Sequence, residues 1–180
     1  MKISIVGPCS GGKTTFSKKM GERLGIEAVN LDEIYVDYKN ITPDNVSFNS
    51  ESKIKTELEK IFKKESWIIE GIYPIEEGFE KADVIIFICR PFLLTLFWQW
   101  KRFFVSKEER TRFGFRQNLA LTLIIWHQYF GREERFRCVG YDYPTIQCFN
   151  SVLKKYKNKV YLFSWFGEEI LISRIKSLIQ

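Results

Sequence analysis

Short apolar runs alternate along the chain with longer segments that mix apolar and polar residues. Five runs are short and apolar enough to be buried strands, at residues 2–6, 28–31, 67–69, 84–88 and 160–163. The segments between and after them are predicted helices, at residues 14–24, 50–64, 91–104, 117–130, 145–156 and 168–179. The alternation predicts an α/β fold, with a five-stranded parallel sheet flanked by helices.

The sequence contains no internal repeat, low-complexity tract or linker, so we expect a single domain over residues 1–180. In an open parallel sheet the ligand lies at the carboxyl ends of the strands. Asp32, Glu70 and Arg90 each follow one of the predicted strands. We therefore expect these three residues to face one crevice, together with the loop after the first strand.

That loop reads GPCSGGKT and matches G-x-x-x-x-G-K-[ST] at every fixed position. A strand precedes it and a helix follows, so its backbone N–H groups and the helix N-terminus are placed to bind phosphate. Lys13 can reach the β and γ phosphates, and the Thr14 hydroxyl can ligate Mg²⁺. These features predict a P-loop that binds ATP with Mg²⁺. The residues expected to bind the nucleotide are Gly7, Pro8, Cys9, Ser10, Gly11, Gly12, Lys13, Thr14 and Thr15.

Basic residues concentrate between Lys101 and Arg137. This stretch has nine basic and four acidic residues, and so carries +5 of the net charge of +6. Arginine suits multidentate contacts with phosphate, which favours a phosphate-clamping segment. A nucleic-acid patch and a merely solvated face are the alternatives. The candidate phosphate-binding arginines are Arg102, Arg110, Arg112 and Arg116.

The four cysteines show no C-x-x-C spacing and are interpreted as isolated thiols in a reducing compartment. No apolar stretch reaches the roughly 18 residues that a membrane span needs. The sequence therefore predicts a cytoplasmic protein with no membrane partner.

Several segments resemble the adenylate-kinase-like branch of P-loop kinases. They are KISIVGPCSGGKTTFSKKMGERLGI at the start, Leu31-Asp32, WIIEGIY at 67–73 and ADVIIF at 82–87, with a weaker match at Trp100-Lys101-Arg102 and the helix beyond it. Within that branch the chain looks most like the proteins known as DNA topology modulation proteins (FlaR-like). The combination of the loop with WIIEGIY narrows the resemblance to these proteins. The loop alone indicates only the superfamily.

The resemblance implies a P-loop NTPase fold with sheet order 2-3-1-4-5 and a helical, arginine-rich lid over about residues 91–137. It implies that Lys13 and Thr14 hold phosphate and Mg²⁺, that Asp32 faces the acceptor, and that Glu70 stands near the metal. Three departures are visible. Glu70 replaces an Asp, Ile72 replaces an Asn, and Arg90 precedes Pro91 where the family has an acidic residue and a later arginine.

The leading hypothesis is a kinase that transfers the γ-phosphoryl group of Mg-ATP to a small acceptor, which could be a nucleotide, a nucleoside or another metabolite. Lys13 and the lid residues Arg102, Arg110 and Arg112 would stabilise the transferred charge. Asp32 would orient or deprotonate an acceptor hydroxyl. A phosphate acceptor would need surrounding arginines instead of a base, and the sequence does not choose between these two.

The alternative is a nucleotide-gated DNA-binding protein, in which Phe103, Phe104, Phe113 and Phe115 stack on bases within the basic segment. A signalling GTPase is disfavoured because the chain lacks an N-K-x-D motif. The lone His127 and the tryptophans at 98, 100 and 126 are interpreted as packing residues. Exposed aromatics in this region could also form a homodimer face.

Overall fold

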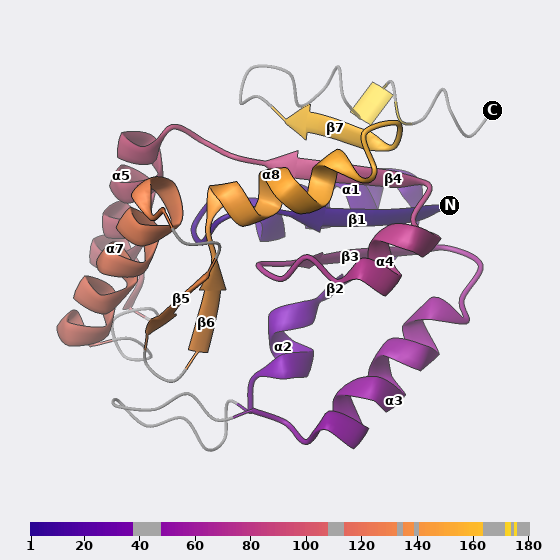
Figure 1. Ribbon diagram of the computed structural model, residues 1–180, viewed down its shortest axis with the longest axis horizontal. Coiled ribbons are helices and arrows are strands. Elements are labelled where there is room, and N and C mark those ends of the chain that lie inside the picture. Colours follow the sequence, from indigo (N-terminus) through magenta and orange to yellow (C-terminus); the bar gives the residue numbers. More distant parts are fainter. Residues whose placement is uncertain are drawn as a thin grey trace.

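The computed structural model describes residues 1–37, 48–107, 114–132, 135–138, 141–163, 172, 173 and 175 (Figure 1). The strands are β1 (Lys2–Val6), β2 (Ala28–Asn30), β3 (Trp67–Gly71), β4 (Val84–Ile88), β5 (Arg135–Cys138), β6 (Tyr141–Pro144) and β7 (Val160–Phe163). The helices are α1 (Lys13–Leu24), α2 (Leu31–Tyr35), α3 (Glu51–Phe62), α4 (Glu76–Lys81), α5 (Phe92–Val105), α7 (Phe115–Phe130) and α8 (Ile146–Lys154).

Five parallel strands form the central sheet in the order β2-β3-β1-β4-β7. The fold class predicted from the sequence is therefore confirmed. The strand expected as the fifth is the seventh in the chain, because β5 and β6 form a separate antiparallel hairpin. That hairpin contains residues of the segment that was expected to be a helical lid.

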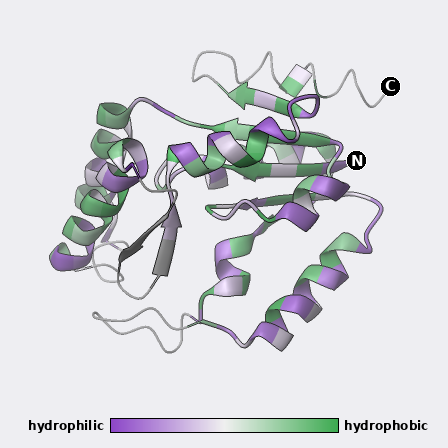
Figure 2. Ribbon diagram, in the orientation of Figure 1, coloured by the Kyte–Doolittle hydropathy of each residue, from purple (hydrophilic) through white to green (hydrophobic). Residues whose placement is uncertain are grey.

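The two faces of the sheet are covered by different helices (Figure 1). On one face, Ile69, Ile85 and Phe87 pack with residues of α3, α4 and α8. On the other, Ile3, Ile5, Ile68 and Ile86 pack with Phe16 and Met20 of α1 and with Ile172 and Ile175. Neighbouring residues such as Ile68 and Ile69 thus point to opposite sides, as the two-residue period of a strand requires. The hydrophobic colouring of the central strands in Figure 2 reflects this burial on both sides.

Local hydrogen bonds explain where two elements begin. The second strand stops one residue earlier than expected, because the Asn30 side chain accepts a hydrogen bond from the Asp32 N–H at 2.8 Å and begins α2. Ser50 caps α3 by accepting a hydrogen bond from the Lys53 N–H. The short helices α2 and α4 were not predicted. The closing helix expected at 168–179 lies largely outside the described residues.

Helices α5 and α7 stand side by side at one end of the sheet (Figure 1). They run in opposite directions, since Phe92 contacts Phe130 while Trp100 contacts Phe115. The buried Gln99 side chain joins them by donating to the Asn118 carbonyl at 2.9 Å. Among the described helices, none combines the length and the apolar character that crossing a bilayer demands.

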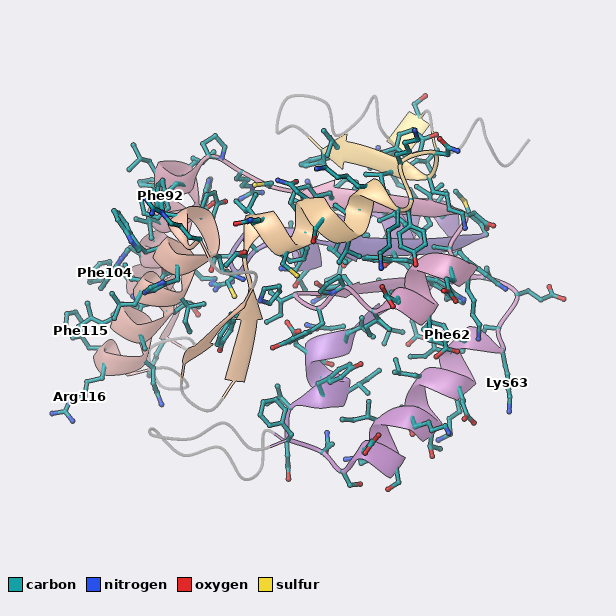
Figure 3. The ribbon with its side chains drawn as sticks, in the orientation of Figure 1. Phe62, Lys63, Phe92, Phe104, Phe115 and Arg116 are labelled. Carbon is teal, nitrogen blue, oxygen red and sulfur yellow. The ribbon has the colours of Figure 1, made fainter. Side chains whose placement is uncertain are left out.

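The outer side of this helix pair is apolar (Figures 2 and 3). Figure 3 shows the labelled Phe104 and Phe115 side chains directed away from the sheet. We call this surface the outer aromatic face. Its members are 44–76% exposed and comprise Leu93, Phe97, Phe104, Phe115, Leu119, Leu123, Trp126 and Phe130.

Candidate active site

The P-loop connects β1 to α1 and packs against the end of β4. Gly7 has φ 154° and leaves no room for a side chain, since a Cβ there would lie 2.0 Å from the Ile88 carbonyl oxygen. Gly12 has φ 91° and Ser10 has φ 55°, both in the left-handed region. The conformation and the close approach to β4 explain why Gly7 and Gly12 must be glycines.

Lys13 begins α1 directly under the loop and is only 6% exposed. Its Nζ donates a hydrogen bond to the Pro8 carbonyl at 2.9 Å, so the ammonium group lies inside the curve of the loop. An ammonium group in this position is suited to meet an anion held by the surrounding amides. The sequence predicted this position from the motif alone.

Glu70 lies in β3, paired with Ile5 of β1 on one side and Asn30 of β2 on the other. It is 2% exposed, and its Oε1 accepts a hydrogen bond from the Thr14 hydroxyl at 2.7 Å. Burial raises the pKa of Glu70 above its ordinary value, while Lys13 and the Thr14 hydrogen bond act in the opposite direction. The register of β1 and β3 therefore brings together the two residues that the sequence assigned to the metal.

Mg²⁺ prefers oxygen ligands and usually takes one or two from the protein, with phosphates and waters completing its shell. The hydroxyl of Thr14 and the carboxylate of Glu70 fit that preference. Within the described part of the chain there is no group of three or more histidine, cysteine or acidic residues that could hold a metal unaided. The donor set therefore suits a metal that arrives with a nucleotide.

Asp32 reaches the same place from α2, the helix that follows β2. Its Oδ1 would lie 3.6 Å from a Cβ at Gly71, so the carboxyl group lies against the end of β3. Burial raises the pKa of Asp32, while the charge of Lys13 and a hydrogen bond from the Ile72 backbone lower it. Asp32, Lys13 and Glu70 thus share one electrostatic environment, as the strand-end rule predicted.

A cavity of about 330 Å³ opens on the other side of the loop, toward α5. The guanidinium of Arg90, which follows β4, lies so near Gly12 that a Cβ at Gly12 would be 2.4 Å from its Nη2. The candidate Arg102 lines this cavity, together with Trp98 and Gln99, which were not predicted to be site residues. The lining residues are Ser10, Gly12, Thr15, Arg90, Trp98, Gln99, Lys101, Arg102 and Val105.

Three further candidate arginines were named from the sequence. Arg110 and Arg112 lie outside the described residues. Arg116 is exposed at the start of α7, and in Figure 3 its side chain extends away from the sheet. The backbone N–H of Cys9 donates a hydrogen bond to the buried Gln128 Oε1 at 2.9 Å, so α7 contacts the loop here. Nothing in the pattern around Gln128 signalled this contact across 119 residues.

No protein-family model matches the chain. Proteins named "Putative adenylate kinase" from Saccharolobus islandicus and Saccharolobus solfataricus are 33% identical to it over 99 residues. The matched region is 52% of this chain and 52% of each relative, so the chain spans about half the length of the curated relatives it matches.

Solved structures match over nearly the whole chain. A shikimate kinase from Acinetobacter baumannii in complex with shikimate has a TM-score of 0.53 at 16% identity, over 99% of this chain and 92% of that one. A deoxyadenosine kinase from M. mycoides with bound dATP has a TM-score of 0.52 at 14% identity, over 98% and 99%. The chain has the P-loop kinase fold. At these identities the likeness concerns the fold.

Proposed function

We propose that this chain is a kinase that transfers the γ-phosphoryl group of Mg-ATP to a small acceptor. The observation that carries the proposal is the meeting of Lys13, the Thr14–Glu70 pair and Asp32 at the carboxyl ends of three adjacent strands. The similarity to proteins named as adenylate kinases supports it. Phosphoryl transfer requires positioning and charge stabilisation more than covalent chemistry, and this set of residues is suited to both.

Each residue has a role that follows from its place. The loop amides and Lys13 hold the β and γ phosphates, and Arg90 and Arg102 add positive charge from the α5 side. Thr14 and Glu70 would hold Mg²⁺, which neutralises phosphate charge when it is bound. The buried Ser10 Oγ has no hydrogen-bond partner among the described residues, which suits contact with a nucleotide in the adjoining cavity.

Two finer statements belong to the same proposal. We infer that the chain is a relative of the DNA topology modulation (FlaR-like) proteins, on the basis of its loop and the WIIEGIY segment. We also infer that residues 1–180 act as one domain, in which residues 91–137 serve as the lid. Arg110 and Arg112 keep their proposed place in that lid.

Titration calorimetry of Mg-ATP against wild type and Lys13→Ala tests the proposal. Lys13 is buried under the loop, so removing its charge should weaken binding at least tenfold, about 1.4 kcal/mol. Lys18→Ala is the matched control, since Lys18 is an exposed lysine on the same helix and its loss should leave the affinity unchanged. Equal affinities for wild type and Lys13→Ala would refute the loop mechanism.

DNA binding by the basic segment stays an alternative prediction. It requires duplex or single-stranded DNA to bind at about 50 mM salt, with an affinity that falls steeply as salt rises. Absence of binding at that salt concentration would remove it.

A further inference from the structure

The charges around the P-loop are divided between its two sides. Strands β2 and β3 lie on one side of β1, and β4 lies on the other. The cations Arg90, Lys101 and Arg102 line the cavity on the β4 side. The carboxylate of Asp32 lies on the β2–β3 side, beside Gly71 and within the influence of Lys13. We expect the phosphates of a nucleoside triphosphate to bind beside the cations. The second substrate then occupies the carboxylate side.

Among the residues that the structure describes on the carboxylate side, few groups could hold a second phosphate. The sequence contains no arginine between Ala28 and Cys89. The described lysines of this stretch are exposed and belong to α3, α4 and the turn after α3, and the labelled Lys63 extends away from the molecule in Figure 3. Three of them bind acidic side chains elsewhere: Lys60 binds Glu57, Lys64 binds Glu27 and Lys81 binds Glu77. Lys39 lies outside the described residues.

Acidic and aromatic groups occupy this side instead. Glu33 follows Asp32 on α2, and its charge acts on both Asp32 and Glu70. Tyr35 of α2 stacks on Tyr73, just after β3, with ring centroids 6.1 Å apart and planes 22° apart. Carboxylates would repel an acceptor phosphate, whereas hydroxyl groups can donate hydrogen bonds to them. Tyrosine rings provide a flat apolar wall for a ring-shaped molecule.

We propose that the acceptor is a neutral, ring-containing molecule with a free hydroxyl group, such as a nucleoside or sugar, and not a nucleotide or other phosphate ester. The inference rests on the proposed kinase function and specifies its second substrate. Asp32 Oδ takes the hydroxyl proton while the acceptor oxygen forms a bond to the γ phosphorus. The bond from that phosphorus to the β–γ bridging oxygen breaks, and its electron pair leaves with ADP. The proton then passes from Asp32 to solvent.

A nucleoside and its monophosphate make a matched pair of probes, because they differ only in the phosphate. With the protein saturated with a non-hydrolysable ATP analogue and Mg²⁺, AMP should bind at least tenfold more weakly than adenosine, or not at all. Asp32→Asn removes one carboxylate and should improve AMP binding relative to wild type. AMP binding tighter than adenosine binding would overturn the inference.

Turnover provides the second measurement. ADP release should be detected with at least one member of a panel of nucleosides and neutral sugars, and Asp32→Asn should lower kcat at least 100-fold while the affinity for the ATP analogue stays unchanged. The inference is wrong if AMP is phosphorylated faster than every neutral compound, or if no neutral compound is phosphorylated. Loss of ATP-analogue binding in wild type would instead refute the kinase function itself, so the two failures are distinguishable.

Discussion

If Asp32 is the general base, its ionisation should appear as a fall of kcat at low pH. Burial raises the pKa of Asp32 above its ordinary value of 3.8. A general base works only when it is deprotonated, so kcat should fall as the pH drops through the raised pKa, at a higher pH than an ordinary aspartate would give. A pH profile of kcat checks this, and the fall should be absent from the residual activity of Asp32→Asn. A fall that persists unchanged in the variant would assign it to another group.

The ionised Glu70 side chain should lower the free energy of unfolding of the protein when no nucleotide is bound. Its raised pKa means that the folded state holds the proton more tightly than the unfolded state. Its contribution to stability is therefore fully present below its ordinary pKa of 4.5 and is lost as the pH rises through the raised value. We expect Glu70→Gln to raise Tm at pH 7 and the gain to shrink toward pH 4.

Thermal unfolding with and without Mg-ATP separates this effect from function. Mg-ATP should stabilise wild type more than Glu70→Gln, since the variant loses a metal-binding carboxylate. Glu59→Gln is the control, because Glu59 is an exposed carboxylate on α3 and should change neither value. A variant that is less stable than wild type at pH 7 would show that the Thr14 hydrogen bond outweighs the burial of charge.

At this scale the sequence predicted that a loop joins a strand to a helix here, because the spacing of Gly7, Gly12 and Lys13 is fixed by the local backbone. Asp32 and Glu70 were placed by the rule that strand ends share a crevice. The same rule expected Arg90 near the loop, but not that its guanidinium would lie on the α5 side against Gly12, and the contact of Gln128 with Cys9 had no signal in the sequence. Both contacts depend on how β4 and α7 approach the loop, and pattern within a segment does not encode that approach.

At the scale of elements, Gln128 joins α7 to both the P-loop and the hairpin. Its Oε1 accepts from the Cys9 N–H, and its Nε2 donates to the Pro144 carbonyl at 3.1 Å. Gln128→Leu would leave two buried backbone groups without partners, which costs about 1–3 kcal/mol each. We expect lower stability and weaker Mg-ATP binding.

Urea unfolding and calorimetry measure the two effects. Gln147→Leu makes the same change on the exposed side of α8, so it should leave both unaltered. Wild-type affinity in Gln128→Leu, after correction for any unfolded fraction, would show that the loop holds its shape without this bond.

The parallel strands were predicted because apolar runs buried on both faces are easily recognised. The single-turn helix α2 and the β5–β6 hairpin were missed for different reasons. α2 depends on one cap, the Asn30 side chain on the Asp32 N–H, in a segment too short to show a period. The hairpin lies between two predicted helices, in a stretch where arginine and aromatic residues hide the alternation of a strand, and its first residues fall in the lid that the family resemblance implied.

At the scale of the whole molecule, the outer aromatic face is large enough to bind a second copy of this chain. Its eight side chains expose apolar area on the order of 800 Å², which is about what each partner contributes to a standard interface. We expect a concentration-dependent dimer that is lost in Phe104→Ser combined with Leu123→Ser.

Light scattering after size-exclusion chromatography reports the mass directly. Leu162→Ser is the control, since Leu162 is 76% exposed on β7, away from the helix pair. If the wild-type protein stays monomeric at high micromolar concentration, the predicted dimer does not form through this face.

Helix α5 borders the cavity on one side and carries part of the outer aromatic face on the other. Trp98, Gln99 and Arg102 border the cavity, while Leu93 and Phe104 belong to the surface that would meet another copy. Any shift of this helix on nucleotide binding would therefore reach the predicted contact between two copies. We expect saturation by ATP to be cooperative in the dimer, and the cooperativity to fade on dilution as the copies separate.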